Sequence, residues 1–327
     1  MRKRAETPRA LGVCEARATA GDNMAKAADK IKGSTRKSYG KITGTHLARA
    51  KEQGYTLTPK GLADYMRKLA NSGTITKSSW YKLRCAIAST QDYGGYKDAA
   101  DRLRALKFPE KATPKAKPRR AKIITDQDFK TLRDTVADKN DTITWAYLTL
   151  CRQLGCRPAE VQHVSELNGE FYVPSAKQRA DGRGLDRFLT VNDPAALFEI
   201  RKAMGIVGSV EPLKRKTLHR VAQSRLNRTT AALWPRRERL PTLYTMRHQM
   251  GSDLKSSGLP PEEVAAVMGH QSTASASVYG YKVSGRGSVA VKPTGATVAK
   301  VRKVCPASSA RFAKPSHKPR SMSKMMR

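Results

Sequence analysis

The sequence LYTMRHQ at residues 243–249 is the most informative part of this chain. It is followed by MGH at residues 268–270 and then by Tyr279, nine residues beyond that histidine. Breaking a phosphodiester by attack of a tyrosyl oxygen requires a phenol as nucleophile and fixed cations around the phosphate. An arginine, a histidine and a tyrosine at these intervals therefore indicate chemistry on a phosphodiester.

Two more candidates lie upstream of this region. Arg157 precedes Pro158, which suits the first turn of a helix, so the sequence predicts that a helix begins at this arginine. Residues 171–173 and 187–191 alternate as two strands, which places Lys177 at the edge of a hairpin where it can reach outward. The same turn offers two alternatives to this lysine, Arg179 and Arg183.

The composition indicates a polyanionic partner. The chain has 327 residues with 63 Lys and Arg against 27 Asp and Glu, a formal net charge of +36. Such a chain repels itself unless a polyanion neutralises it, and nucleic acid is the polyanion that this balance favours. Its length is enough for two domains with their own cores.

Other classes of protein fit the sequence poorly. No apolar run approaches the roughly 18 residues that a bilayer span needs, and no apolar segment follows the basic start, so we expect neither a membrane protein nor a secreted one. The five cysteines show no metal-ligand spacing, which predicts reduced thiols and no metal site. We expect a cytoplasmic, nucleoid-associated protein, with Met24 as a second candidate start.

Charge and proline content predict five segments. The fold class that we expect is mainly α-helical with a small antiparallel sheet, arranged as a two-domain clamp on DNA. In chain order the segments are a basic flexible arm at 1–33, a helical DNA-binding domain at 34–108, a basic proline-rich linker at 109–121, a catalytic domain at 122–284 and a basic disordered tail at 285–327.

The first domain carries candidate DNA contacts. Thr58 followed by Pro59, and later Thr76, predict the starts of two helices. Basic residues lie largely off the apolar face of the second helix, where they could contact phosphates, or alternatively form an ordinary solvated face. The candidates on this helix and on the linker are Lys77, Lys82, Arg84, Lys115, Lys117, Arg119 and Arg120.

These motifs, in this order, resemble those of the tyrosine recombinases of the phage integrase family. The resemblance covers most of the chain and rests on the Arg157 segment, Lys177, the Arg247 segment, and His270 with Tyr279 at the expected interval. It implies an amino-terminal helical clamp domain joined by a linker to a catalytic domain. It also implies a site-specific recombinase that works through a 3′-phosphotyrosyl intermediate without ATP or metal.

The resemblance implies a role for each site residue. Arg157 and Arg247 clamp the phosphate, Tyr279 attacks it, and Lys177 protonates the leaving 5′ oxygen. His270 holds a phosphate oxygen or helps to remove the tyrosyl proton. Tyr281 is an alternative nucleophile, and only its spacing from the histidine disfavours it.

Tyr244 departs from the family pattern, because the residue three before the second arginine is usually histidine. Hairpin telomere resolvases, which are relatives of the recombinases, can carry tyrosine at this place. A phenol is neutral at pH 7, so Tyr244 could donate a hydrogen bond to the phosphate but could not act as a charged acid. It could equally be a packed aromatic residue.

The expected partners are duplex DNA, further copies of the chain, with a tetramer on paired sites, and a DNA-bending accessory protein. Three alternatives to a recombinase stay open: a hairpin telomere resolvase, an enzyme like a type IB topoisomerase, and a DNA-binding protein that has lost activity. The recombinase, the resolvase and the topoisomerase-like enzyme would each form a covalent adduct with DNA, whereas the inactive DNA-binding protein would not.

Overall fold

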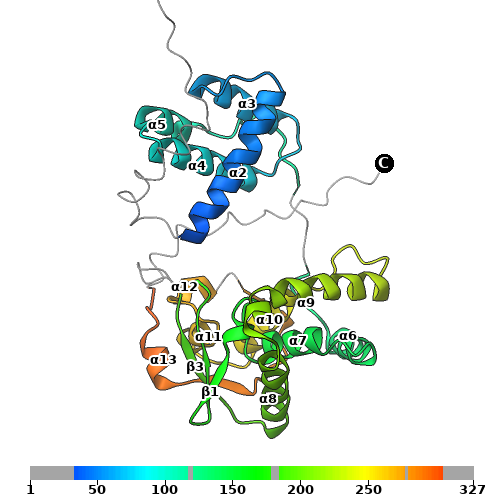
Figure 1. Cartoon of the computed structure of the whole chain (residues 1–327). Coiled ribbons are helices and arrows are strands. Elements are labelled where there is room, and N and C mark those ends of the chain that lie inside the picture. The colour runs from blue at the N-terminus through cyan, green and yellow to red at the C-terminus, as the bar shows by residue number, and fades with distance from the viewer. Residues whose placement is uncertain (1–32, 117–120, 178–183, 277–278, 305–327) are drawn as a thin grey trace, which may run out of the picture. The chain divides into compact units, whose positions relative to one another are not determined.

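The computed structural model describes residues 33–116, 121–177, 184–276 and 279–304. The predicted basic arm lies outside the described residues except for its last residue. The chain divides into two compact units, residues 1–118 and 119–327, which are shown in Figure 1 and described here one at a time.

Unit 1 is a small helical bundle. It contains α2 (Gly33–Glu52), α3 (Pro59–Asn71), α4 (Lys77–Tyr93) and α5 (Lys97–Ala105). The side chains of Thr58 and Thr76 cap α3 and α4 as the sequence predicts. Trp80 of α4 is buried, and its indole nitrogen donates to the carbonyl of Met66 in α3 at 2.8 Å. The apolar faces of the helices thus form one core for this unit.

The start of the predicted linker packs on unit 1 and is not free. Just before the linker Phe108 is buried, and within it Ala112 packs against the same apolar cluster. The backbone nitrogen of Lys115 donates to the carbonyl of Ile75 at 3.0 Å. At the other end of the linker Ala121 is buried in unit 2, where its carbonyl accepts from the hydroxyl of Thr245 at 2.8 Å. Proline and lysine content suggested an extended segment, but these tertiary contacts fix both of its ends.

Unit 2 is mainly helical with one small sheet. Its first helices are α6 (Asp126–Asp138) and α7 (Thr142–Gln153), and α8 (Pro194–Gly208) and α9 (Pro212–Leu233) follow the first three strands. Next come α10 (Leu243–Ser256), α11 (Pro261–Val267) and α12 (Thr273–Ala276), with short 3-10 turns at Val161–His163 and Lys282–Ser284. The expected fold class, mainly α-helical with a small antiparallel sheet, is therefore confirmed.

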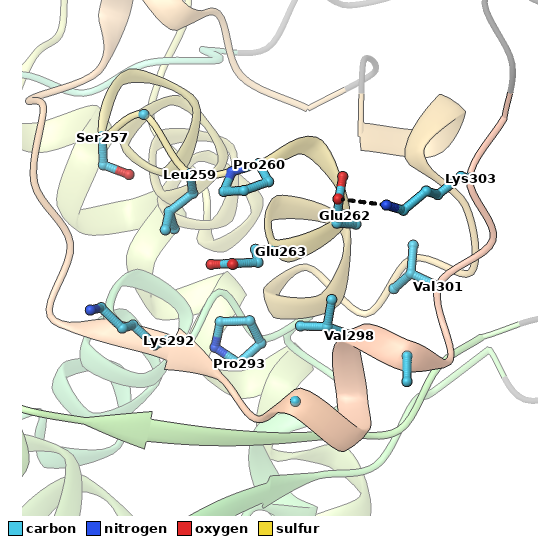
Figure 2. A pocket seen from close by; sticks show the side chains of 13 residues that line it. Ser257, Leu259, Pro260, Glu262, Glu263, Lys292, Pro293, Val298, Val301 and Lys303 are labelled. Carbon is cyan, nitrogen blue, oxygen red and sulfur yellow. Dashed lines mark ion pairs between the residues drawn. The ribbon is translucent and has the colours of Figure 1, made fainter.

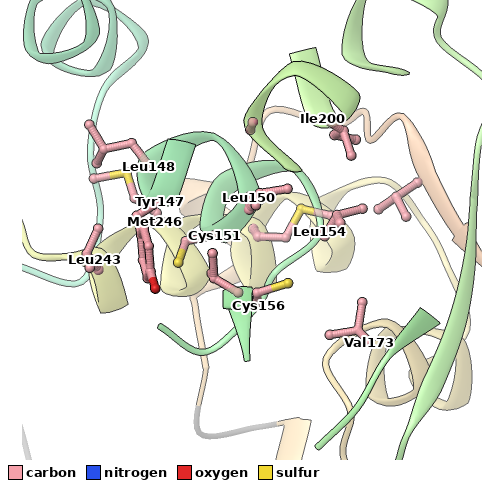
Figure 3. Close-up of a cluster of buried hydrophobic side chains, with 14 of the residues drawn as sticks. Tyr147, Leu148, Leu150, Cys151, Leu154, Cys156, Val173, Ile200, Leu243 and Met246 are labelled. Carbon is pink, nitrogen blue, oxygen red and sulfur yellow. The ribbon is translucent and has the colours of Figure 1, made fainter. Parts of the chain in front are cut away.

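The core of unit 2 surrounds α7, which is buried on nearly all sides. Figure 3 shows Leu150 and Cys151 of α7 and Leu154, the residue just after it, beside Cys156, with Met246 of α10 among the same cluster. A buried ion pair between Arg152 of α7 and Asp253 of α10 joins these two helices as well. Since α10 carries Arg247, this packing fixes the backbone of the candidate site.

The sheet is antiparallel, with the order β1-β2-β3-β4. Its strands are β1 (Ser165–Leu167), β2 (Glu170–Val173), β3 (Arg187–Val191) and β4 (Val291–Pro293). Strands β2 and β3 are paired as predicted, with Tyr172 opposite Phe188. Lys177 therefore follows the end of β2, on the connection to β3.

The prediction of a disordered tail from residue 285 is wrong for the residues up to 304. Strand β4 pairs with β3, and α13 (Gly295–Ala299) follows it, with Val301 buried. The hydroxyl of Thr297 accepts a hydrogen bond from the backbone nitrogen of Phe188 at 3.0 Å. Pairing with an existing strand supplies the stability that the sequence of this segment lacks. Residues 305–327 lie outside the described part.

Candidate active site

Arg157 lies in a tight turn and not at the start of an α-helix, which corrects the prediction from Pro158. The backbone nitrogen of Arg157 donates to the carboxylate of Glu160 at 2.9 Å, and its guanidinium pairs with the same carboxylate. Gly155, at φ +61, makes the turn out of α7. The guanidinium also reaches the carbonyl of Gly269 at 3.4 Å, which brings the first motif against the third.

Arg247 is fully buried in the second turn of α10. A reciprocal pair of hydrogen bonds between Thr242 and Thr245 begins this helix. The guanidinium of Arg247 donates to the carbonyls of Gly155 and Met268, so the helix holds its side chain between the first and third motifs. Arg157 and Arg247 thus lie together, although 90 residues separate them in the sequence.

The charges around these arginines do not balance within the described residues. Arg157 and Arg187 both pair with Glu160, and all three side chains are buried. Burial alone would raise the pKa of Glu160, but the arginines lower it to about 2. Burial, together with Arg157 and Arg187, lowers the pKa of Arg247 to about 10, because no carboxylate of the described residues pairs with it. The cluster therefore has an excess of positive charge, which favours a bound anion.

His270 lies against Arg247 and is neutral. Burial, followed by the charges of Arg247, Arg157 and Arg187, lowers its pKa to about 2. The Nε2 atom of His270 lies 3.4 Å from Nη2 of Arg247. A guanidinium can only donate, so Nε2 is the acceptor and the proton of the ring sits on Nδ1. Nδ1 has no partner among the described residues.

This buried histidine has a measurable effect on stability. Because the folded pKa lies below the unfolded value near 6.5, the unfolded chain takes up a proton that the folded chain does not. Stability therefore falls as the pH drops below about 6.5, by ~1.4 kcal/mol per pH unit for His270. We expect His270→Gln to reduce the loss of melting temperature between pH 7.5 and 5 relative to wild type. An unchanged slope would mean that His270 takes up its proton in the folded chain.

Tyr279 lies within this cluster. Its ring is stacked on that of His248 with centroids 5.0 Å apart, and the ring of His270 lies 4.9 Å from it. The guanidinium of Arg247 lies 5.0 Å from the same ring centroid. The structure thus brings together the second arginine, the histidine and the tyrosine that the sequence singles out.

The segment after Tyr279 is fastened to α10. Gly280 has φ +64, and a Cβ there would collide with the backbone of Gly251 and Ser252. Lys255 donates to the carbonyls of Tyr279 and Gly280 at 2.6 and 3.0 Å, and its burial lowers its pKa. These contacts fix where the backbone of the nucleophile candidate lies.

Tyr281, the alternative nucleophile, lies elsewhere. Its backbone nitrogen donates to the hydroxyl of Ser252, and its side chain is exposed. Its phenol accepts a hydrogen bond from Lys122 at 3.0 Å. The geometry therefore favours Tyr279 over Tyr281 as the residue next to Arg247.

The root of the hairpin connects Lys177 to Arg157. The backbone nitrogen of Ala176 donates to Glu160 at 3.2 Å, which ties the chain just before Lys177 to the arginine turn. Gly184, at φ +94, lies so close to the opposite arm that a Cβ would lie 2.9 Å from the carbonyl carbon of Lys177. The side chain of Lys177 itself is exposed. Its two alternatives, Arg179 and Arg183, lie outside the described residues.

Tyr244 lies at the edge of the site, with 36% of its surface exposed. Its burial and the nearby Tyr279 raise the pKa of its phenol, against the lowering effect of Arg157 and Arg247. The phenol is therefore neutral and can donate a hydrogen bond.

The candidate DNA-contacting residues differ in how far their side chains are exposed. Lys77 and Lys82 of α4 and Lys115 are exposed. Arg84 is half-buried and donates to the carbonyl of Leu106 at 2.6 Å, so part of its guanidinium has a structural partner. The remaining candidates, Lys117, Arg119 and Arg120, lie outside the described residues.

Sequence reasoning missed three residues of this site. Glu160 was recognised only as a member of the first motif and of the predicted helix, with no role of its own, whereas it binds both Arg157 and Arg187. Arg187 was read as an ordinary strand residue, and His248 only as a neighbour of Arg247. Alternation along β3 does place Arg187 on the same face as the buried Leu189, which was the one available signal.

A hollow of about 880 Å³ lies away from this cluster. Figure 2 shows that it is lined by the segment from Ser257 to Pro260, by Glu262 and Glu263 of α11, and by β4 and α13, with an ion pair from Glu262 to Lys303 of 3.0 Å. The arginines of the site do not line it.

Within the described part of the chain, no helix is long and apolar enough to cross a membrane.

The fold of this chain is similar to the folds of solved integrase structures. Its structure is similar to a lambda integrase dimer bound to a COC' core site, with a TM-score of 0.58 at 15% identity over 84% of this chain and 81% of that one. It is also similar to a lambda integrase tetramer bound to a Holliday junction, with a TM-score of 0.59 at 15% identity, covering 84% and 79%. The Tn1549 transposon integrase in complex with a circular intermediate DNA gives 0.51 at 12% identity, covering 81% and 95%.

At these identities the likeness is one of fold. No family model and no curated protein sequence matches the chain.

Proposed function

We propose that this protein is a site-specific DNA recombinase of the integrase type, which cleaves and rejoins DNA strands through a 3′-phosphotyrosyl intermediate. One observation carries the proposal. Among the described residues, the buried Arg157 and Arg187 share the one carboxylate of Glu160. A third buried arginine, Arg247, pairs with no carboxylate there, and Tyr279 lies against it. A phosphodiester supplies the missing negative charge beside a nucleophile.

The reaction that these groups would perform is a transesterification. Tyr279 gives its phenolic proton to solvent, its oxygen attacks phosphorus, a new phosphorus–oxygen bond forms, and the bond to the 5′ oxygen breaks. Arg157 and Arg247 stabilise the charge that builds up on the non-bridging oxygens. Lys177 gives its proton to the leaving 5′ oxygen. The reverse attack by a 5′-hydroxyl restores the diester, so rejoining conserves the energy of the broken bond.

His270 fits one of its two possible roles better. Its Nε2 faces the donor of Arg247, so this nitrogen is not free to take a proton from Tyr279. The proton on Nδ1 can instead be donated to a phosphate oxygen. We therefore assign His270 to holding the phosphate.

A nicked suicide substrate tests the proposed function. A nick just beyond the scissile phosphate lets the short 5′-hydroxyl fragment diffuse away, so that the covalent adduct accumulates. We expect a protein–DNA band that survives denaturation and is removed by protease. Salt-sensitive retention of DNA without this band would instead support the DNA-binding protein that has lost activity.

Tyr244 is expected to contribute through its hydroxyl. Removing a neutral donor to the phosphate in Tyr244→Phe should slow single-turnover cleavage by roughly tenfold, since a neutral hydrogen bond is worth about 1 kcal/mol or slightly more. DNA affinity should stay close to wild type. A cleavage rate equal to that of wild type would show that Tyr244 is only a packed aromatic residue.

The working assembly is proposed to be several copies on paired DNA sites. The lambda integrase structure, which is a tetramer on a Holliday junction, supports this arrangement. The exposed Lys77, Lys82 and Lys115 would bind DNA phosphates, so the protein would act at the nucleoid.

Tyr244 favours the hairpin telomere resolvase as the second candidate. An inverted-repeat substrate that is converted to hairpins would identify it.

A further inference from the structure

Arg187 is a buried cation to which the proposed chemistry gives no role. It begins β3 and is fully buried, on the inward side that Leu189 also occupies. Its Nη2 donates to Glu160 at 3.1 Å, while Nε and Nη1 have no partner among the described residues. Burying a guanidinium costs free energy unless it is paired and hydrogen-bonded, and Glu160 is the one carboxylate of the described residues that pairs with Arg187. Its presence therefore calls for a function.

The carboxylate of Glu160 connects Arg187 to the hairpin that carries Lys177. It accepts from Ala176, which lies on the outgoing arm directly before Lys177, and from Arg187, which lies on the returning arm. It also binds the backbone and guanidinium of Arg157. Both arms of the hairpin are thus tied to the arginine turn through a single carboxylate.

Arg187 also packs against the third motif. A Cβ at Gly269 would lie 2.7 Å from Nη1 of Arg187 and 3.1 Å from the carbonyl oxygen of Leu185. Gly269 precedes His270, and its carbonyl accepts from Arg157. The guanidinium of Arg187 therefore fills the space between the hairpin root and the turn that carries the histidine.

Loss of Arg187 would affect the hairpin more than it would affect the position of Arg157. Without Arg187, the Arg157 side chain still has the Glu160 carboxylate and the Gly269 carbonyl as partners. The returning arm would lose its side-chain bond to Glu160. Only the bond from Ala176 would then join Glu160 to the arm before Lys177.

We propose that Arg187 is a positioning residue, which acts through Glu160 to fix the root of the hairpin and thereby the reach of Lys177 to the leaving 5′ oxygen. The inference rests on the proposed function, because it assigns a residue to one step of that reaction. A loosened hairpin leaves the phosphate clamp in place and misplaces the acid. Misplacing a reacting group by about 1 Å can cost roughly a hundredfold in rate.

The test compares two nicked substrates, one with the ordinary 5′ oxygen at the scissile phosphate and one with sulfur in its place. A thiolate leaves without being protonated, because a thiol has a pKa near 8.5, far below that of an alcohol. We expect the full-length Arg187→Met variant to cleave the oxygen substrate tenfold to a hundredfold more slowly than wild type at saturating DNA, on the order of the cost of a displaced acid. It should cleave the sulfur substrate at nearly the wild-type rate.

Two controls make the result specific. Lys177→Ala removes the acid itself and should show the same pattern with a larger defect. Arg201→Met makes the same chemical change at an exposed arginine that pairs with Glu166, and should cleave both substrates like wild type. Where circular dichroism shows that Arg187→Met is unfolded, Arg187→Lys takes its place, because it retains a cation beside Glu160.

Equal slowing of both substrates would overturn the inference, since Arg187 would then act on the phosphate or on the fold as a whole. Wild-type rates on both substrates would overturn it too. An absence of adduct with wild-type protein on either substrate would be a different result, because it would refute the proposed function itself.

Discussion

Replacing Tyr279 with phenylalanine will lower the yield of covalent adduct with nicked DNA by on the order of 10⁴-fold or more, because the attacking oxygen is lost. The phenylalanine ring can keep the contacts that the tyrosine ring makes with the rings of His248 and His270, so binding of DNA should not change. The measurement is the yield of protein–DNA adduct on a denaturing gel, together with the dissociation constant of the uncleaved complex.

Tyr281→Phe is the matched control for this variant. Tyr281 has an exposed side chain that contacts Lys122, and its hydroxyl can be removed without touching the arginine cluster. We expect its adduct yield to remain within a fewfold of wild type. Loss of adduct in Tyr281→Phe with a normal yield in Tyr279→Phe would reverse the assignment of the nucleophile.

Arg247→Lys should reduce the rate of single-turnover cleavage by roughly a hundredfold or more, equivalent to about 3 kcal/mol. The guanidinium bonds the carbonyls of Gly155 and Met268 and has further donors that can face the phosphate. Lysine keeps the charge but has no planar fork, so it cannot hold both carbonyls and a phosphate oxygen in fixed geometry. The rate is measured at saturating DNA so that weaker binding does not contribute.

Arg225→Lys is the control for Arg247→Lys. Arg225 pairs with Asp141 on the surface, so this change should leave both cleavage and melting temperature near wild type. The melting temperature of Arg247→Lys is measured alongside, since Arg247 is fully buried. A cleavage rate within a fewfold of wild type would exclude the clamp formed by Arg157 and Arg247.

The sequence predicted the segments of the site better than their connections. The interval from His270 to Tyr279 and the helix that begins near Tyr244 are local features, and the structure brings these residues to Arg157 and Arg247. The interaction of Glu160 with Arg187 joins positions that are 27 residues apart. No local pattern reveals such a pair, because both residues look like ordinary surface charges until the sheet forms.

The same limit explains the error in the tail. Strand β4 is short, contains Lys292 and Pro293, and lies in a stretch rich in glycine and serine. Its strand conformation comes from pairing with β3, where Val191 lies opposite Val291. The turn at Arg157 differs from the predicted helix for a related reason, since the carboxylate of Glu160 captures its backbone nitrogen.

Lys255 and Ser252 bind the chain at and just after Tyr279. These bonds bear on the number of protein molecules that a single cut requires. The tyrosine and both clamping arginines belong to the same polypeptide, and Gly280 seats that tyrosine on the helix of Arg247. Under the proposed chemistry, one copy of the protein can sever one strand with its own tyrosine. Additional copies would then be needed for the exchange of partners and not for the incision.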